Sequence, residues 1–500
     1  MRSLLRRSLV PSFRSEDIAS DVFRPLHAGK RLLSPRNFLF WSLIAIVTLS
    51  PLPFGSNQPW SWALLSLLVG LLVIAWAIAA ARDRSLIRIE WRRSRLIVVP
   101  FSILVLWFLI QASGLTPESW HHPLWQEVSD ALGIPLSGAI SLNPEASHTA
   151  VMRLLAYGGV FWLAFQFGSD KKHAKQAFWA VAIAGILYAV YGLGAHLSGS
   201  EKILWYAKSA YRDSLTSTFI NRNSYATYTG IALLVTLALL LAEIRRVLRY
   251  SPISSGEFLA FFDACGLRFY FLVVAAGTLF TALLLTQSRG GFLSIAVGIG
   301  AFAVVSSRRF KKRKKTFAIL PIAIWGALAL GSVGVILLMS GDRTFSRMNA
   351  TLSTGGDRIA IYQRTADAIQ DAPVTGMGIG AFKESFSLYR DETVRFYVQT
   401  IDRAHNTYLE LALEGGLPAL MLMLLLIFYL TLLCFLGALN RTRNALYPAT
   451  GVAISALVCT HAVVDFSIQI PAVAVTYLLI LGVACAQSWS TREAPPAKAR

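Results

Sequence analysis

Residues 403–439 read RAHNTYLELALEGGLPALMLMLLLIFYLTLLCFLGAL. The first part is polar, whereas residues 417–439 carry no charged side chain. A run of this length crosses about 30 Å of hydrocarbon as an α-helix. The stretch therefore predicts a membrane-spanning helix with a polar segment at one end.

Runs of the same kind recur along the whole chain. The chain has 500 residues, of which 55% are hydrophobic and 15% charged, and its mean hydropathy is +0.54. A soluble chain of this length is not expected to be so apolar. We therefore predict an all-α, polytopic membrane protein with about 12 transmembrane helices and a partly helical periplasmic cap. The expected spans are residues 37–55, 60–81, 96–113, 149–168, 177–197, 223–242, 268–287, 290–306, 316–339, 417–439, 445–466 and 468–488.

The net charge of +20 follows membrane orientation and does not indicate a nucleic-acid partner. Basic residues cluster between apolar runs on alternate sides, whereas residues 56–59 and 114–148 contain no Lys or Arg. Cytoplasmic loops carry the excess of basic residues in membrane proteins. Both termini are therefore predicted to be cytoplasmic and residues 340–404 periplasmic. The clusters assigned to the cytoplasm are residues 82–95, 171–175, 245–249, 308–315 and 441–443.

The same pattern divides the chain into five parts. Residues 340–404 hold eight basic and eight acidic residues, a balance that favours a folded, salt-bridged cap. Within it, residues 357–369 have helical spacing, with Ile359, Tyr362, Ala366 and Ile369 on one face. The expected parts are a basic cytoplasmic tail (1–36), transmembrane helices 1–9 (37–339), a periplasmic cap loop with the candidate catalytic helix (340–416), transmembrane helices 10–12 (417–488) and a cytoplasmic tail (489–500).

Small residues and cysteines argue against several site types. Gly376, Gly378 and Gly380 follow Pro373 and have no preceding strand, so they predict a turn and not a nucleotide-binding loop. The four cysteines show neither a pairing pattern nor metal-ligand spacing. We expect no disulfide, no metal and no cofactor.

Two arginines are placed unusually. Arg222 lies between Asn221 and Asn223 at the expected outer start of a span, and Arg289 lies in the turn Ser288-Arg289-Gly290-Gly291 between two spans. Glycines at a helix start leave backbone N–H groups open to an anion, and a guanidinium grips two phosphate oxygens at once. Either arginine alone is equally explained as a membrane anchor. The two together favour an anionic ligand at the outer leaflet.

Two histidines are further candidates. His405 stands at a loop-to-membrane junction, where a neutral imidazole can accept a proton from a hydroxyl. The alternative for His405 is a helix-capping or interfacial residue. His461 and Asp465 are four residues apart, so they are expected to share one helical face, either as part of a site or as a structural hydrogen bond.

Several short motifs resemble those of one family. They are Thr218–Asn223, Ser288–Gly291, Asp357-Arg358 with Asp371–Gly378, His405-Asn406 to Gly415-Gly416, and Val464–Pro471. Together they resemble the O-antigen ligase and O-antigen polymerase superfamily of bacterial envelope glycosyltransferases, over roughly residues 210–475.

This resemblance implies a metal-independent, inverting glycosyltransferase in the bacterial inner membrane. The implied donor is a glycan on undecaprenyl diphosphate, and the implied acceptor is a sugar hydroxyl, on lipid A–core for a ligase or on another lipid-linked repeat for a polymerase. Arg222 and Arg289 would hold the diphosphate and His405 would activate the acceptor. The motifs also place Asn221, Asn223, Ser288, Gly290, Gly291, Arg358, Arg403, Asn406, His461 and Asp465 at the substrate site.

A transporter or flippase of lipid-linked sugars is the alternative from another class. Transporters favour charged residues near mid-membrane, interrupted helices and internal repeats. The candidate charges here gather at one expected face of the membrane, which favours the enzyme.

Overall fold

The structure is a computed structural model that describes residues 34–250, 258–307, 344–391, 401–441 and 443–489. The predicted span at 316–339, the basic run at 308–315 and most of both terminal tails lie outside these residues. The α-helices are α3 (Pro35–Leu49), α4 (Pro59–Arg82), α5 (Trp91–Ala112), α6 (Leu124–Leu132), α7 (Pro144–Gly168), α8 (Lys171–Leu197), α9 (Arg222–Tyr250), α10 (Phe258–Asp263), α11 (Leu267–Leu285), α12 (Arg289–Ser307), α14 (Thr344–Asp371), α15 (Phe382–Ser387), α16 (Thr407–Gly415), α17 (Leu417–Asn440), α18 (Leu446–Ala462) and α19 (Pro471–Ala486). The short elements are the 3₁₀ turns η1 (Phe54–Ser56), η2 (Arg84–Leu86), η3 (Glu118–Trp120) and η5 (Ser467–Gln469), and the strands β1 (Lys202–Ile203) and β2 (Tyr206–Ala207).

Local sequence explains where most of these helices begin. Proline, which lacks an N–H that the first helical turn leaves unpaired, stands at the first or second position of α3, α4, α7, α17 and α19. The side chains of Asn143, Asp170 and Asn406 cap α7, α8 and α16 by accepting from backbone N–H groups of the first turn.

The helices form a bundle around α9. Side chains of α9 are buried almost continuously from Ser224 to Leu241, and the helix packs against α8, α11, α12, α18 and α19. Among the described residues, seven helices are long and apolar enough to span a membrane, and three shorter helices are also apolar. The prediction of an all-α membrane protein is confirmed, although this set does not establish the number of 12 spans.

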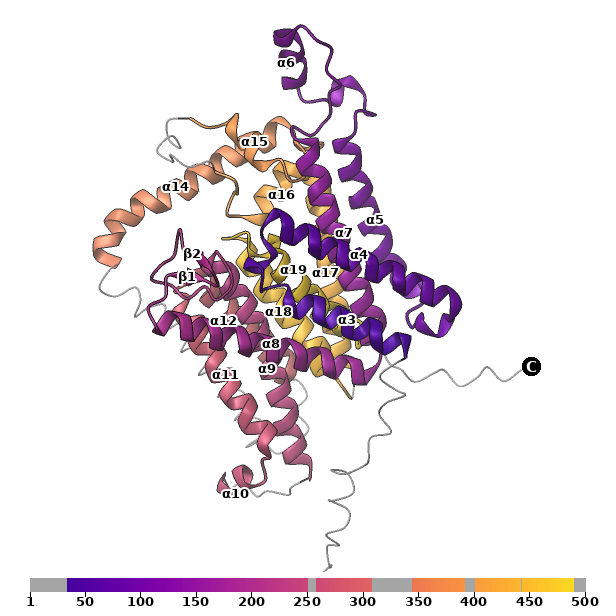
Figure 1. The fold of residues 1–500 in the computed structure, drawn as a ribbon, viewed down its shortest axis with the longest axis vertical. Helices are drawn as coiled ribbons and strands as arrows, with labels where there is room; N and C mark the ends of the chain where they lie inside the picture. The colour runs from indigo at the N-terminus through magenta and orange to yellow at the C-terminus, as the bar shows by residue number, and fades with distance from the viewer. Residues whose placement is uncertain (1–33, 251–257, 308–343, 392–400, 442, 490–500) are drawn as a thin grey trace, which may run out of the picture.

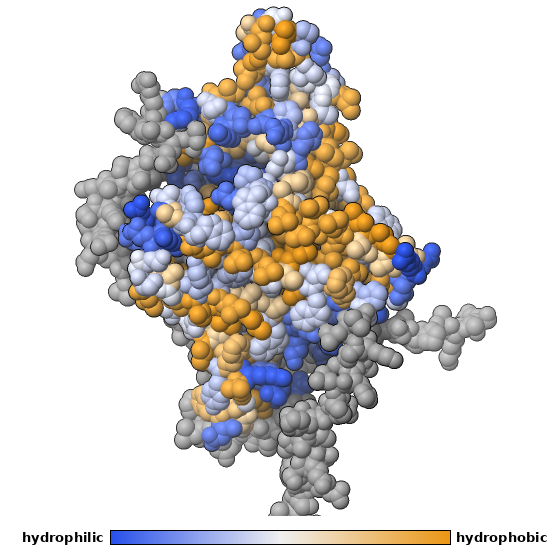
Figure 2. All heavy atoms as spheres, viewed as in Figure 1, coloured by the Kyte–Doolittle hydropathy of each residue, from blue (hydrophilic) through white to orange (hydrophobic). Residues whose placement is uncertain are grey.

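The outer helices of the bundle expose apolar side chains. Only 28% of the spanning window of α4 and 22% of that of α17 is buried, against 50% for α7, α8 and α12. Figure 2 shows the resulting apolar surface over α4 and α5. An exposed apolar surface along membrane-length helices fits contact with lipid.

The two ends of the molecule differ. In Figure 1, α6 stands at the top and α10 at the bottom of the longest axis, with α14, α15 and α16 in the upper part. We call the upper part the α16 end and the lower part the α10 end. Residues 114–148 and α10 thus lie at opposite ends of the molecule, and their placement on opposite sides of a membrane stays a prediction.

The described part of residues 340–404 folds onto α16 through a small core of its own. This core contains Ile361, Ala368, Met377, Phe382, Phe386, Ala404 and Leu413. The predicted helix is present, and Tyr362 and Ile369 of its predicted face pack against this core. The prediction is wrong for Ile359, which is 58% exposed, and it missed Ile361, which is buried.

The predicted glycine turn after Pro373 is confirmed. Gly376, Gly378 and Gly380 all have φ between 65° and 102°. A Cβ on Gly376 would lie 2.4 Å from the carbonyl oxygen of Glu414, so the turn packs directly on the backbone of α16. Glycine is needed here both for the left-handed backbone and for the close approach.

Two predicted spans end earlier than expected. The first ends at Leu49, because Pro51 and Pro53 follow and lead into η1. The eleventh, expected over 445–466, ends at Ala462 and is followed by a turn. This second difference changes the interpretation of Asp465.

Candidate active site

Asn223 is the centre of a hydrogen-bonded network between distant parts of the chain. Its Nδ2 donates to Oδ2 of Asp465 over 2.7 Å, and its Oδ1 accepts from the Ser288 hydroxyl over 2.8 Å. Oδ1 of Asp465 accepts from the Ser467 hydroxyl over 2.5 Å, and its backbone carbonyl accepts from the Thr407 hydroxyl over 3.0 Å. These five residues, the Asn223 network, tie the starts of α9, α12 and α16 to the turn after α18.

The three predicted catalytic residues are chain neighbours of this network. Arg222 immediately precedes its central residue and opens α9. Arg289 immediately follows Ser288 and is the first residue of α12. His405 lies two residues before Thr407, the first residue of α16. Residues that are far apart in the sequence therefore meet at the α16 end of the bundle.

The turn before α12 is more closed than expected. Ser288 caps the helix, because its hydroxyl oxygen accepts from the N–H of Gly291 over 3.1 Å. A Cβ on Gly290 would lie 3.1 Å from the His461 ring, and one on Gly291 would lie 2.8 Å from Cβ of Ala226. The prediction that both glycines leave open N–H groups is thus wrong for Gly291. The glycines instead let α12 approach α9 and α18.

His461 and Asp465 do not share a helical face as predicted. Because α18 ends at Ala462, Asp465 lies in the following turn. Both side chains are almost fully buried and both face α9, where Nδ1 of His461 is hydrogen-bonded to Thr227. Asp465 and His461 therefore join α18 to α9 side by side, which is a structural role, and their contact with substrate stays a prediction.

His405 is held in an unusual conformation. Its φ is +54°, and its carbonyl oxygen accepts from the Tyr362 hydroxyl of α14 over 3.0 Å. Its ring lies 5.2 Å from the ring of Phe466, centroid to centroid. A left-handed backbone at a non-glycine residue is uncommon and is often found at functional sites.

The surroundings of this imidazole favour its neutral form. Burial lowers the pKa of His405 below its ordinary value, the charge of Asp465 opposes this shift, and the charge of Arg358 adds to it. Nδ1 is buried without a hydrogen-bond partner among the described residues. Contact of the other ring nitrogen, Nε2, with a substrate hydroxyl stays a prediction.

Positive charge surrounds the site. The guanidinium carbon of Arg222 lies 5.2 Å from the ring centre of Tyr211, and its Nη1 donates to Ser214 over 3.1 Å. Burial raises the pKa of Tyr211, while the nearby charges of Arg222 and Arg358 lower it. Arg289 and Arg358 are exposed and make no hydrogen bond or ion pair with any residue in the described ranges. Arg222 and Arg289 therefore stand at the starts of α9 and α12, beside residues of the Asn223 network.

The remaining predicted residues serve the local structure. Nη1 of Arg403 donates to Oε1 of Glu410 over 2.9 Å and to Gln469 over 2.7 Å. The Asn406 side chain caps α16 by accepting from two backbone N–H groups, and the Asn221 side chain accepts from the N–H two residues on. These contacts use the groups that we predicted for substrate, and their role in binding stays a prediction.

Two connected cavities lead from the apolar surface toward α16. The larger has a volume of about 1230 Å³ and lies between α4, α5, α7, α17 and α19. The smaller, of about 260 Å³, is lined by Arg153, Arg403, Glu414 and Gln469 as well as apolar residues. The cavities share lining residues, including Leu154.

A comparison with protein families found a match over part of the chain. Residues 274–424 match the family described as O-antigen ligase. This segment, 151 of the 500 residues, is similar to an O-antigen ligase domain. A search of curated proteins found no match to the sequence.

The matched region of the O-antigen ligase domain includes Arg289, Arg358 and His405. Arg222 and Asp465 lie outside it, and the Asn223 network joins Asp465 to Ser288 and Thr407 inside it. The family indicates a glycosyltransferase-like enzyme that acts on lipid-linked glycans in a membrane. The resemblance inferred from short motifs is therefore confirmed at the level of the family.

Sequence reasoning missed the aromatic residues that surround the site. Tyr211, Tyr362 and Phe466 contact or flank Arg222 and His405. Aromatic residues are frequent throughout this chain, so their type alone carries no signal. Only their contacts with the charged groups distinguish them.

Proposed function

We propose that the protein transfers a glycan from undecaprenyl diphosphate to an acceptor sugar hydroxyl, as an O-antigen ligase with lipid A–core as acceptor. The observation that carries the proposal is the Asn223 network, which brings the helix starts bearing Arg222 and Arg289 next to His405. The proposal includes inversion at the anomeric carbon and no requirement for a metal.

The arginines act on the leaving group. Cleavage of a bond between a sugar and a diphosphate places negative charge on the departing oxygen, so fixed positive groups lower the barrier. Arg289 and Arg358 are exposed and available for this purpose, and Arg222 is held in place by Tyr211. Guanidinium groups can bind phosphate oxygens in pairs, as a divalent cation does.

His405 acts on the acceptor. The acceptor hydroxyl donates its proton to Nε2 as its oxygen attacks the anomeric carbon from the face opposite the diphosphate. One bond forms between the acceptor oxygen and the sugar as the bond to the diphosphate breaks, which inverts the configuration. A positioned base of this kind contributes about 10²–10⁴-fold to the rate.

The connected cavities accommodate the lipid part of a substrate. Their walls are apolar along α4, α5 and α7, and they end at Arg153 and Arg403 near α16. A lipid chain in the larger cavity would leave its polar head at the α16 end. We assign that end to the periplasmic face because the segments without basic residues lie there.

Single-residue variants test the site. Arg289→Ala and His405→Ala should each lower transfer by at least about 100-fold, with normal insertion into the membrane. Arg289→Ala should weaken donor binding, whereas His405→Ala should leave it intact. Arg212→Ala is a matched control, because Arg212 is an exposed cation whose ion pair with Glu201 is also exposed. Full activity of Arg289→Ala at ordinary donor concentrations would refute the diphosphate role.

The acceptor and the orientation need separate tests. Purified enzyme should transfer glycan to lipid A–core and not to a second lipid-linked repeat; the reverse preference would identify a polymerase. Single reactive cysteines at Ser387 on α15 and at Ala264 after α10 should be labelled from opposite sides of the membrane. Labelling of both from one side would contradict the assigned orientation.

A further inference from the structure

A third cavity with a distinct chemistry lies far from the active site. It has a volume of about 460 Å³ and is formed by the start of α8, the last part of α9 and the segment that leads into α18. Among the described residues, four basic side chains and no Asp or Glu line it; the basic residues are Lys171, Arg245, Arg249 and Arg443. We propose that this cavity binds the phosphodiester headgroup of an anionic phospholipid.

The first argument is the convergence of charge. Lys171, Arg249 and Arg443 are exposed to solvent, whereas Arg245 is half-buried. Here cations from three separate segments line one cavity, where their mutual repulsion is unfavourable unless an anion is bound. Basic pockets between membrane helices are a known type of lipid headgroup site.

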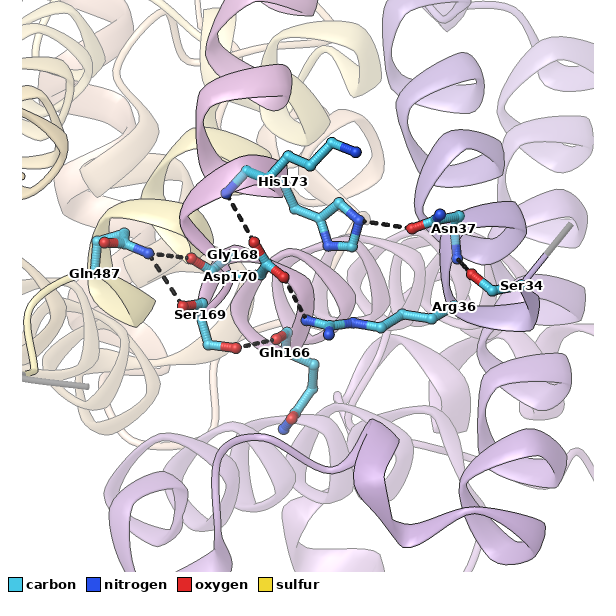
Figure 3. Close-up of polar contacts among 10 residues, drawn as sticks. Ser34, Arg36, Asn37, Gln166, Gly168, Ser169, Asp170, His173 and Gln487 are labelled. Atoms are coloured by element: carbon cyan, nitrogen blue, oxygen red, sulfur yellow. Dashed lines mark hydrogen bonds and ion pairs between the residues drawn. The ribbon is translucent and has the colours of Figure 1, made fainter. Parts of the chain in front are cut away.

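The second argument is that nearby carboxylates are bound elsewhere. Figure 3 shows Asp170 turned toward Arg36, with an ion-pair distance of 3.6 Å, while its other oxygen accepts from the backbone N–H of Lys172 over 2.7 Å. Glu243 on α9 pairs with Arg246 over 2.6 Å. Neither carboxylate lines the cavity, and Lys171, Arg249 and Arg443 make no ion pair among the described residues, so an external anion can pair with these three. Arg245 also donates to the carbonyl oxygen of Ser306 over 3.4 Å.

The third argument is the rest of the lining. The N-terminus of α18 lies in the wall, and its capping residue, Ala445, makes no side-chain hydrogen bond to the first turn. A helix start that no side chain caps favours an anion. The floor is apolar and includes Phe178, whose ring packs edge-on against Tyr447 at 4.8 Å. A charged rim over an apolar floor matches a headgroup with its first acyl carbons, and fits a free phosphate less well.

The test uses the purified full-length protein in a neutral detergent. Its melting temperature is measured with increasing short-chain phosphatidylglycerol, short-chain phosphatidylcholine or inorganic phosphate. We expect stabilisation by phosphatidylglycerol alone. The double variant Arg249→Gln, Arg443→Gln should need at least tenfold more phosphatidylglycerol for the same shift.

The control removes the same charge elsewhere. Arg84→Gln with Arg92→Gln eliminates two exposed cations from another basic loop that does not line the cavity, and should bind lipid like the unmodified protein. An equal loss in this control would show diffuse surface charge and overturn the proposal. So would equal stabilisation by phosphatidylcholine or by inorganic phosphate.

A second variant covers the case in which the double variant does not fold. Ala242→Phe keeps every charge but places a ring in the lining of the cavity. It should abolish the effect of phosphatidylglycerol. An undiminished effect in Ala242→Phe would refute binding in this cavity.

Discussion

Exchanging the two side chains at the centre of the site network provides a sharp test of their role. Asn223 donates to Asp465 and accepts from Ser288, and Asp465 also accepts from Ser467. In the double variant Asn223→Asp, Asp465→Asn the amide and the carboxylate change places. The carboxylate at position 223 then accepts from Ser288 and from the new amide, whose oxygen accepts from Ser467. Every hydrogen bond has a donor and an acceptor again.

The single substitutions lack this compensation. Asn223→Ala removes a hydrogen bond to a carboxylate, which contributes about 1.5–3 kcal/mol, and one to a hydroxyl, which contributes about 0.5–1.5 kcal/mol. The expected destabilisation is therefore about 2–4.5 kcal/mol. Asn223→Asp also places two carboxylates in contact, where like charges about 4 Å apart repel by ~4 kcal/mol near a protein surface. The exchange should recover at least about 2 kcal/mol of coupling energy.

Melting temperatures of the four proteins in one detergent measure this coupling, and glycan transfer is measured beside them. If Asp465 only positions α9, α12 and α16, the exchange restores both stability and transfer. If the Asp465 carboxylate itself contacts substrate, the exchange restores stability without transfer. Failure to restore stability would refute the description of the Asn223 network.

Three further predictions follow from the described contacts. Because burial lowers the pKa of His405, transfer should decline on acidification only below the ordinary histidine pKa of about 6.5. The charge of Arg358 also lowers this pKa, so Arg358→Gln should move the decline to higher pH in the pH–rate profile. Gly416→Ala should abolish folding in an expression and melting assay, because its Cβ would lie 2.1 Å from the carbonyl oxygen of Val374 at a φ of 81°. In the control Gly133→Ala, the φ is 64° and no atom lies within 4 Å of the new Cβ, so the free energy of unfolding should fall by only about 1 kcal/mol. Burial raises the pKa of Glu414 to about 8, above its value in the unfolded chain, so the folded protein loses stability as the pH rises toward 8 and the buried carboxyl becomes charged. Glu414→Gln should therefore change the melting temperature little at pH 5 and raise it at pH 9.

The sequence by itself determined the elements and the membrane class. Helix spans follow from the length of apolar runs, and helix starts follow from proline and Asx caps, because both depend on residues within a few positions of each other. The glycine turn at 376–380 is predictable for the same reason. Short motifs in fixed order also carried the family resemblance, which the match over residues 274–424 confirmed.

Only the tertiary structure decided which polar groups meet. Asn223 binds Asp465, 242 positions away, and Ser288, 65 positions away. An amide or a carboxylate accepts many partners equally well, so residue type does not select one. The selection comes from helix packing, in which Gly290 and Gly291 bring α12 close to α18 and α9. For the same reason, residue type alone does not separate Arg403 from Arg289, yet in the fold Arg403 pairs with Glu410 while Arg289 is exposed.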